Sequence, residues 1–136
     1  MNINQFVNNS HIAPALIHGV VDQVGGWESF QEIARDVSNY GADSGYSGFI
    51  YYSETVEFAE IYQGPIMRLV RDMADEFGTN WLDLIESFGC IDLQAHEIAD
   101  ILAGNDDDNK TQLFNALAWF ALEEVSRAYV DFSGGE

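Results

Sequence analysis

The stretch Gly48–Gly78, GFIYYSETVEFAEIYQGPIMRLVRDMADEFG, decides the fold of this chain. Apolar residues recur in it at steps of three and four, which is the spacing of one face of an α-helix. These residues are Phe58, Tyr62, Ile66, Leu69, Met73 and Phe77. The spacing predicts a long helix that presents one continuous apolar face to a core and an anionic face to its surroundings.

The dipeptide Gly64-Pro65 interrupts this helix. Proline lacks a backbone N–H, and its ring clashes with the carbonyl four residues earlier, here that of Ile61, at a cost of about 3 kcal/mol inside a helix. We therefore expect a kink, or two helices that abut near residue 64. Gly78 is well suited to end the second half, because a helix often closes on a glycine in the left-handed conformation.

Just before the helix, Phe49–Tyr52 is a short run of aromatic and β-branched residues, which favour strands. A strand needs a partner, and the candidates are Ile3–Val7, Cys90–Leu93 or a second subunit. The run predicts one small β element. A lone strand together with a long apolar helix also allows a twofold homodimer.

Caps, glycines and apolar spacing predict further helices on both sides of this stretch. They cover about residues 11–24, 27–39, 79–88, 93–103 and 110–131. Thr79 or Asn80 is the expected cap of the third of these, and Asp92 that of the fourth. The last helix is apolar almost all round, which is typical of a helix at the centre of a core.

The predicted fold is mainly α, or α+β only by virtue of the small β element. We expect about five to seven helices packed around the central C-terminal helix in one domain that spans residues 1–136. With 47% hydrophobic and 13% aromatic residues, the chain has enough apolar side chains to build such a core, and a disordered polyanion is excluded.

Charge is the outlying property of the composition. The chain has 23 Asp and Glu against 5 Lys and Arg, a net charge of −18. Such a chain folds against its own repulsion, so a saline environment or a cationic partner is expected. Direct binding to nucleic acid or to an anionic membrane is not expected, because both carry the same sign of charge.

The sequence also predicts a cytoplasmic protein. Cys90 is the single cysteine and cannot form an internal disulfide, which is typical of a reducing compartment. Met1–Gln5 lacks the basic start of a signal peptide. No run approaches the roughly 18 apolar residues that a spanning helix requires.

The negative charge gathers in the middle of the chain. Residues 43–108 hold fifteen acidic and two basic residues, a net charge of −13. On a helix, residues three or four apart lie about 5–6 Å apart, and B-DNA presents one phosphate per ~3.4 Å of each strand. Rows of carboxylates at helical spacing can therefore imitate a phosphate track at coarse resolution.

The carboxylates of these rows are the predicted partner-binding residues. They are Glu54, Glu57, Glu60, Asp72, Asp75, Glu76, Asp83 and Glu86. The expected partner is a basic nucleic-acid-binding protein or complex. The competing interpretation is that these residues are merely the solvated faces of amphipathic helices, although a surface built for solubility usually mixes both signs.

Other chemistries fit the sequence poorly. His96-Glu97 resembles part of a zinc-protease helix, but a catalytic zinc needs three protein ligands, and His11 and His18 lie far off in sequence. The run Asp106–Asp108 lacks the glycine and the glutamate that an EF-hand loop requires at later positions. We expect no catalytic residue, no cofactor and no metal, and hence no enzyme.

The segment Asn39–Gly78, which begins NYGADSGYSGFIYYSETVEF, resembles small acidic proteins carried by bacteriophages and related mobile elements. In charge the chain resembles acidic counter-defence factors, which include antirestriction and anti-CRISPR proteins. The resemblance implies a non-enzymatic inhibitor that mimics nucleic acid and blocks a restriction or CRISPR effector of the host. The alternative is a regulatory or structural interaction module that uses the Tyr- and Gly-rich loop 40–52, with the acidity serving solubility.

Overall fold

The computed structural model describes residues 2–40, 52–87, 92–105 and 107–134, without the side chains of Tyr52 and Ser53. Across these ranges the chain forms eight helices and no strand. The helices are α1 (Ile3–Asn9), α2 (Pro14–Gln23), α3 (Trp27–Tyr40), α4 (Tyr52–Ile61), α5 (Gln63–Phe77), α6 (Trp81–Glu86), α7 (Ala95–Leu102) and α8 (Lys110–Phe132).

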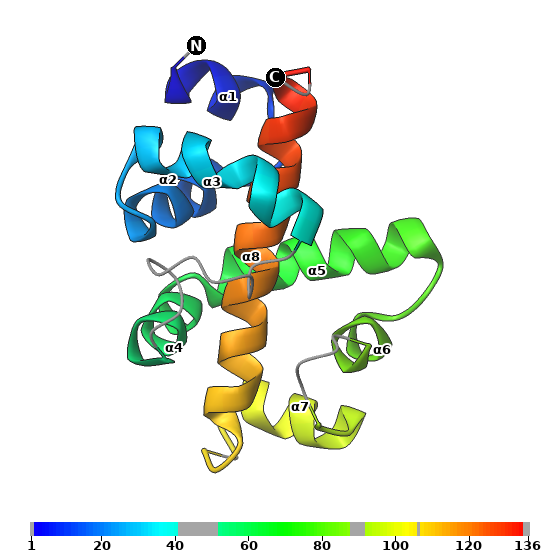
Figure 1. The fold of residues 1–136 in the computed structure, drawn as a ribbon. Helices are drawn as coiled ribbons and strands as arrows, with labels where there is room; N and C mark the ends of the chain where they lie inside the picture. Colours follow the sequence, from blue (N-terminus) through cyan, green and yellow to red (C-terminus); the bar gives the residue numbers. More distant parts are fainter. Residues whose placement is uncertain (1, 41–51, 88–91, 106, 135–136) are drawn as a thin grey trace.

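Helix α8 runs through the middle of the molecule, and the other helices lie around it (Figure 1). Helices α3 and α4 make the most extensive contacts with it, and α1, α2 and α5 also touch it. Leu113, Leu117 and Leu122 on α8 are fully buried. The mainly α fold and the central C-terminal helix predicted from the apolar pattern are confirmed.

Helix α1 is not predicted by the apolar spacing, because it is only seven residues long. A helix this short is marginal alone and depends on tertiary contacts. It begins with a capping box between Asn2 and Gln5. Its Phe6 is fully buried and packs edge-on against Tyr129 of α8, with ring centroids 5.6 Å apart.

Of the kink and the pair of abutting helices expected near Gly64-Pro65, the structure has the pair, α4 and α5. The break lies at Tyr62, slightly before the predicted position, and Tyr62 is the N-cap of α5. Pro65 thus falls in the first turn of α5, where a missing N–H costs nothing. The apolar face ends early, because Phe77 is 66% exposed; the prediction of one continuous buried face is wrong at this residue.

The predicted β element at Phe49–Tyr52 is not supported. Residues 49–51 lie outside the described part of the chain, and Tyr52 is the first residue of α4. The candidate partner Ile3–Val7 lies in α1, and Cys90 is also outside the described residues. The aromatic and β-branched composition is overruled at Tyr52 by the helix that packs on α8.

Three helix starts refine the prediction. Helix α2 begins at Pro14, so His11 precedes it. Helix α6 is capped by Asn80, whose side chain accepts a hydrogen bond from the Asp83 N–H at 2.9 Å. Helix α7 is capped by Gln94, which was not expected, instead of Asp92; the Asp92 N–H donates to the side chain of Gln112.

A buried polar contact joins α4 to α8. Thr55 is fully buried, and its hydroxyl donates a hydrogen bond to the side-chain carbonyl of Asn115, itself 4% exposed. A buried polar group that is left unpaired is costly, so this contact favours one rotation of α4 about its axis. That rotation places Glu54 and Glu57, the neighbours of Thr55 in sequence, on the exposed side.

Candidate functional site

All eight predicted carboxylates are exposed. Helix α4 carries Glu54, Glu57 and Glu60, helix α5 carries Asp72, Asp75 and Glu76, and helix α6 carries Asp83 and Glu86. They are exposed because the apolar residues between them face α8 or a neighbouring helix. What the carboxylates bind remains a prediction.

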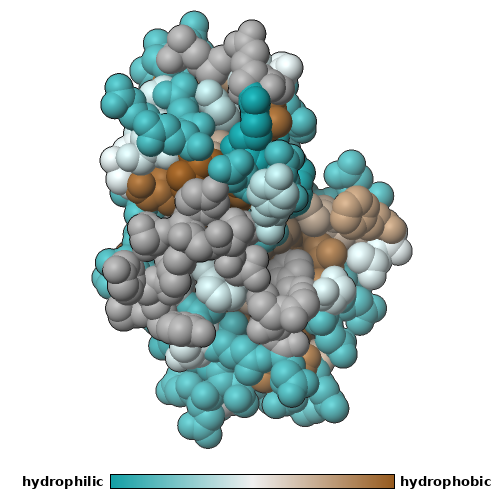
Figure 2. All heavy atoms as spheres, in the orientation of Figure 1, coloured by the Kyte–Doolittle hydropathy of each residue, from teal (hydrophilic) through white to brown (hydrophobic). Residues whose placement is uncertain are grey.

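The structure divides these residues into two groups. Helix α5 packs on α6, whereas α4 and α6 lie on opposite sides of α8 in Figure 1. The carboxylates of α4 thus form one group, and those of the projecting end of α5 and of α6 form another. Figure 2 shows that the face turned to the viewer is largely hydrophilic, with an apolar patch over the projecting end of α5.

Few positive charges neutralise this surface. Among the described residues, Glu60 is the one member of the eight that makes an ion pair, with the Lys110 ammonium at 3.2 Å. The Arg71 guanidinium lies over the Trp81 ring, 5.3 Å from its centroid. A carboxylate without an ion-pair partner attracts an approaching cation with its full negative charge.

Polar side chains hold two of the carboxylates in place. The Gln23 amide donates a hydrogen bond to Glu54 at 3.4 Å, and the Asn80 amide donates one to Asp83 at 3.0 Å. These contacts leave the negative charge intact, since an amide is neutral. They also reduce the rotamer freedom that a binding partner would otherwise have to freeze.

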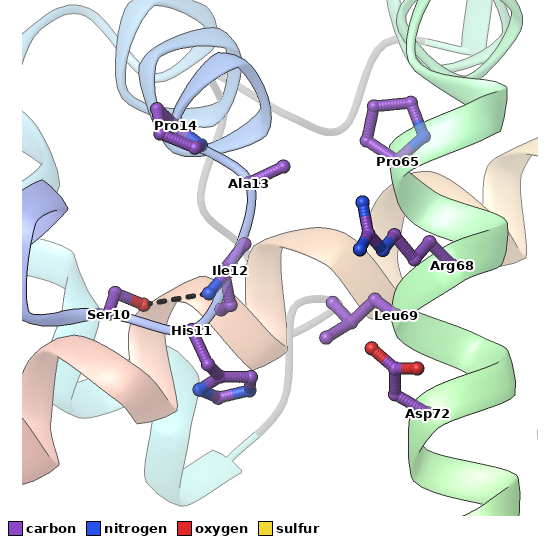
Figure 3. A pocket seen from close by; sticks show the side chains of 9 residues that line it. All are labelled: Ser10, His11, Ile12, Ala13, Pro14, Pro65, Arg68, Leu69 and Asp72. Atoms are coloured by element: carbon purple, nitrogen blue, oxygen red, sulfur yellow. Dashed lines mark hydrogen bonds between the residues drawn. The ribbon is translucent and has the colours of Figure 1, made fainter.

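A hollow of about 340 Å³ lies between α5 and the segment that leads into α2. Figure 3 shows Arg68 and Asp72 pointing from α5 toward the segment that holds His11. The Ile12 N–H in that segment donates to the Ser10 hydroxyl at 3.2 Å. This hollow has mixed charge, so Asp72 is less suited to imitate a phosphate than a carboxylate with no cation beside it.

A second hollow, the α2–α4 groove, has a volume of about 390 Å³. It is lined by Gly19, Asp22, Gln23, Glu54, Glu57, Phe58, Ile61 and Tyr62. Asp22 is exposed and was not among the eight predicted residues. The sequence contains a signal for Asp22, because the residue lies in the last turn of its helix. A carboxylate there is unfavourable next to the negative end of the helix dipole, and this makes Asp22 a candidate binding residue.

Gly19 on α2 leaves room for the ring of Tyr62, the residue that directly follows α4. A Cβ at this position would lie 2.5 Å from the Tyr62 ring, closer than real Cβ contacts come. Tyr62 also packs on Phe58, with ring centroids 4.8 Å apart. The groove therefore combines an aromatic wall with an acidic rim.

No group of three or more His, Cys, Asp and Glu in the described ranges is placed to hold a metal ion. His11 lies in the segment before α2 and His18 on that helix, so the two do not share a helix face. Glu97 serves α7 as a cap, since its carboxylate accepts a hydrogen bond from the Gln94 N–H at 3.1 Å.

Glu124 on α8 has a shifted carboxyl pKa. Burial raises the pKa of its carboxyl above the ordinary value of 4.5; the ion pair with Arg127 opposes this rise, Glu123 adds to it, and His11 opposes it weakly. Its side chain is 14% exposed. Because the Glu124 carboxyl is mostly buried and ion-paired with Arg127, it is poorly accessible to a binding partner.

A family described as a domain of unknown function (DUF7222) matches residues 7–134. The chain belongs to this family. The DUF7222 match spans α2 to α8 and the last three residues of α1, so it includes all eight predicted carboxylates and the α2–α4 groove. Comparisons with curated proteins and with solved structures gave no match. No helix in the described ranges is long and apolar enough to cross a membrane.

Proposed function

We propose that this protein is a non-enzymatic acidic inhibitor that mimics nucleic acid. It occupies the basic groove of a nucleic-acid-binding defence complex of a bacterial host, such as a restriction or CRISPR effector, and is encoded by a phage or a related mobile element. One observation carries the proposal: eight exposed carboxylates stand on three consecutive helices, and Glu60 alone among them has an ion-pair partner in the described part of the chain.

The helical scaffold supports mimicry by holding charges at set spacings. Asp72 and Asp75, and Asp83 and Glu86, are three residues apart on their helices, a separation of about 5–6 Å. Because the helices are packed on a buried core, the backbone that carries the charges does not have to be ordered when the partner binds. Pre-ordering of this kind raises affinity by lowering the entropy cost of association.

The sign of the surface also supports a cationic partner. Like charges at helical spacing destabilise a helix by a few tenths of a kcal/mol per pair, so their retention suggests a gain elsewhere. A basic groove that normally holds DNA or RNA offers that gain, because bound counterions are released when the carboxylates enter it. Such binding weakens steeply with salt.

The test is capture of a partner from a bacterial lysate with the immobilised protein, washed across a salt series and challenged with duplex DNA. The test variant reverses Glu57, Asp75, Glu76 and Glu86 to Lys; it spares Glu60 and its ion pair with Lys110. The control reverses Glu32, Asp100, Asp107 and Asp131, four exposed carboxylates outside the eight, and so changes the net charge equally.

We expect the wild-type protein to retain a nucleic-acid-binding complex that salt and DNA release. The test variant should lose it, and the control should keep most of it. Equal loss in both variants would reduce the effect to net charge and contradict the proposal. A partner that stays bound at high salt would favour the interaction module of loop 40–52, of which residues 41–51 lie outside the described ranges and Tyr40 is 73% exposed.

A further inference from the structure

We propose that the α2–α4 groove is a receptor for a single arginine side chain on the surface of the basic partner. The inference rests on the proposed function, since that partner supplies the arginine. It goes beyond it by naming one pocket, one ligand group and a carboxylate, Asp22, outside the eight predicted residues.

Charge complementarity is the first argument. Asp22, Glu54 and Glu57 line the groove, and none of the described residues of its lining is basic. Asp22 also stands in the last turn of α2, where the helix carbonyls add partial negative charge and no basic residue offsets it. The groove therefore joins three carboxylates to the negative end of a helix, and all four attract a cation that enters it.

The aromatic wall is the second argument, and it selects among cations. Tyr62 is half-buried beside the acidic rim and packs on the buried ring of Phe58, and Ile61 at the edge of the groove is 65% exposed. A guanidinium is planar, stacks on aromatic rings and forms bidentate hydrogen bonds with carboxylates. The aliphatic part of the arginine side chain also covers apolar surface. An ammonium on a lysine forms a weaker match, since it is strongly hydrated and does not stack.

The spacing of the carboxylates is the third argument. In the described part of the chain no three acidic, His or Cys side chains converge closely enough to hold a metal ion, and this includes the three of the groove. A compact ion is therefore a poorer match for these three carboxylates than an extended cation. The groove volume of about 390 Å³ falls in the lower part of the range of roughly 300–1,000 Å³ that is usual for ligand clefts.

The experiment is an NMR titration of the isotope-labelled protein with the blocked peptide acetyl-Gly-Gly-Arg-Gly-Gly-amide, and with the same peptide carrying Lys. We expect the largest chemical-shift changes at the backbone amides of Gly19, Gln23 and Ile61. The arginine peptide should bind more tightly than the lysine peptide. Shifts spread evenly over α4, α5 and α6, or equal binding of both peptides, would overturn the proposal.

Two matched pairs of variants localise the effect. Asp22→Asn should lower the affinity for the arginine peptide by about fivefold, which corresponds to about 1 kcal/mol. Asp75→Asn, which removes the same charge, should change this affinity little. Gly19→Ala pushes the Tyr62 ring aside without a charge change and should weaken binding, whereas Gly64→Ala meets no atom within 4 Å and should not. If Gly19→Ala does not fold, the Asp22 and Asp75 pair decides.

The outcomes separate the two proposals. Equal effects of Asp22→Asn and Asp75→Asn would refute the arginine receptor and leave the acidic inhibitor standing, because diffuse charge would then explain the binding. Arginine binding in the groove, with no nucleic-acid-binding complex retained from the lysate, would refute the inhibitor and leave the receptor standing.

Discussion

At the scale of single residues, Glu124 combines partial burial with an ionised partner. It lies on the central helix, ion-pairs with Arg127 one turn later, and keeps only 14% of its side chain exposed. Burial outweighs the attraction to Arg127, so the pKa of its carboxyl is raised. Its charged form is thus less favourable in the folded protein than in the unfolded chain.

The raised pKa predicts a pH dependence of stability. Between the unfolded and folded pKa values the native state binds more protons, so the stability from Glu124 is present at acid pH and is lost as the pH rises through its folded pKa. Glu124→Gln removes this loss. The unfolding free energy of the variant, relative to wild type, should rise as the pH increases from about 4.5 upward.

Urea unfolding monitored at several pH values measures this difference. The matched control is Glu86→Gln, which removes the same charge from an exposed position without an ion pair in the described part of the chain; the rise for Glu124→Gln should be the larger of the two. A falling or flat difference for Glu124→Gln would contradict the raised pKa.

At the scale of helices, α6 depends on its cap. It has only six residues, so its intrinsic stability is low. The Asn80 side chain accepts the Asp83 N–H and also donates to the Asp83 carboxylate. The start of α6, and with it the position of Asp83 and Glu86 beside α5, is therefore set by one side chain.

Removing this cap should loosen α6 selectively. Asn80→Ala is expected to cost about 0.5–2 kcal/mol of stability and to speed amide hydrogen exchange in residues 81–86. Amide hydrogen exchange in the buried middle of α8 should speed up only as much as the loss of global stability requires. Thr79→Ala is the control, because Thr79 was the alternative cap in the sequence and makes no capping contact in the structure. Equal effects of the two substitutions would contradict the assignment of the cap.

At the scale of the whole molecule, the net charge of −18 works against folding. The carboxylates on α4, α5 and α6 face outward, and within the described ranges Glu60 alone of the eight makes an ion pair. Their mutual repulsion acts through solvent, where dissolved ions screen it. The Debye length falls from about 30 Å at 0.01 M salt to about 10 Å at 0.1 M.

Sodium chloride should therefore raise the melting temperature while it weakens partner binding. We expect a steady rise in Tm between about 0.01 and 0.3 M salt, a range over which screening changes most. The variant with Glu57, Asp75, Glu76 and Glu86 reversed should melt higher than wild type at low salt and respond less to added salt. A melting temperature that falls or stays constant would show that repulsion does not limit stability.

Local patterns were sufficient for much of the fold. The helix over residues 27–39 and the central helix near 110–131 follow from apolar spacing and agree closely with α3 and α8. The break before Pro65 follows from proline chemistry, and the exposure of the eight acidic residues follows from the polar face of each helix. These features depend on residues only a few positions apart in the chain.

Features that depend on distant residues were missed or predicted wrongly. Helix α1 is held by Phe6 against Tyr129, and the start of α4 at Tyr52 takes the place of a predicted strand. Phe77 is exposed because α5 projects beyond the core at that end.

The sequence by itself determined the helical class, the central helix and the strong negative charge, because composition and short-range spacing dictate them. Only the tertiary structure decided that α4 and α6 lie on opposite sides of α8, and that Asp22 joins Glu54 and Glu57 beside the Tyr62 ring. The physical reason is that helix packing depends on close fit across the core. In this groove the position of the Tyr62 ring depends on Gly19, because a Cβ there would displace the ring.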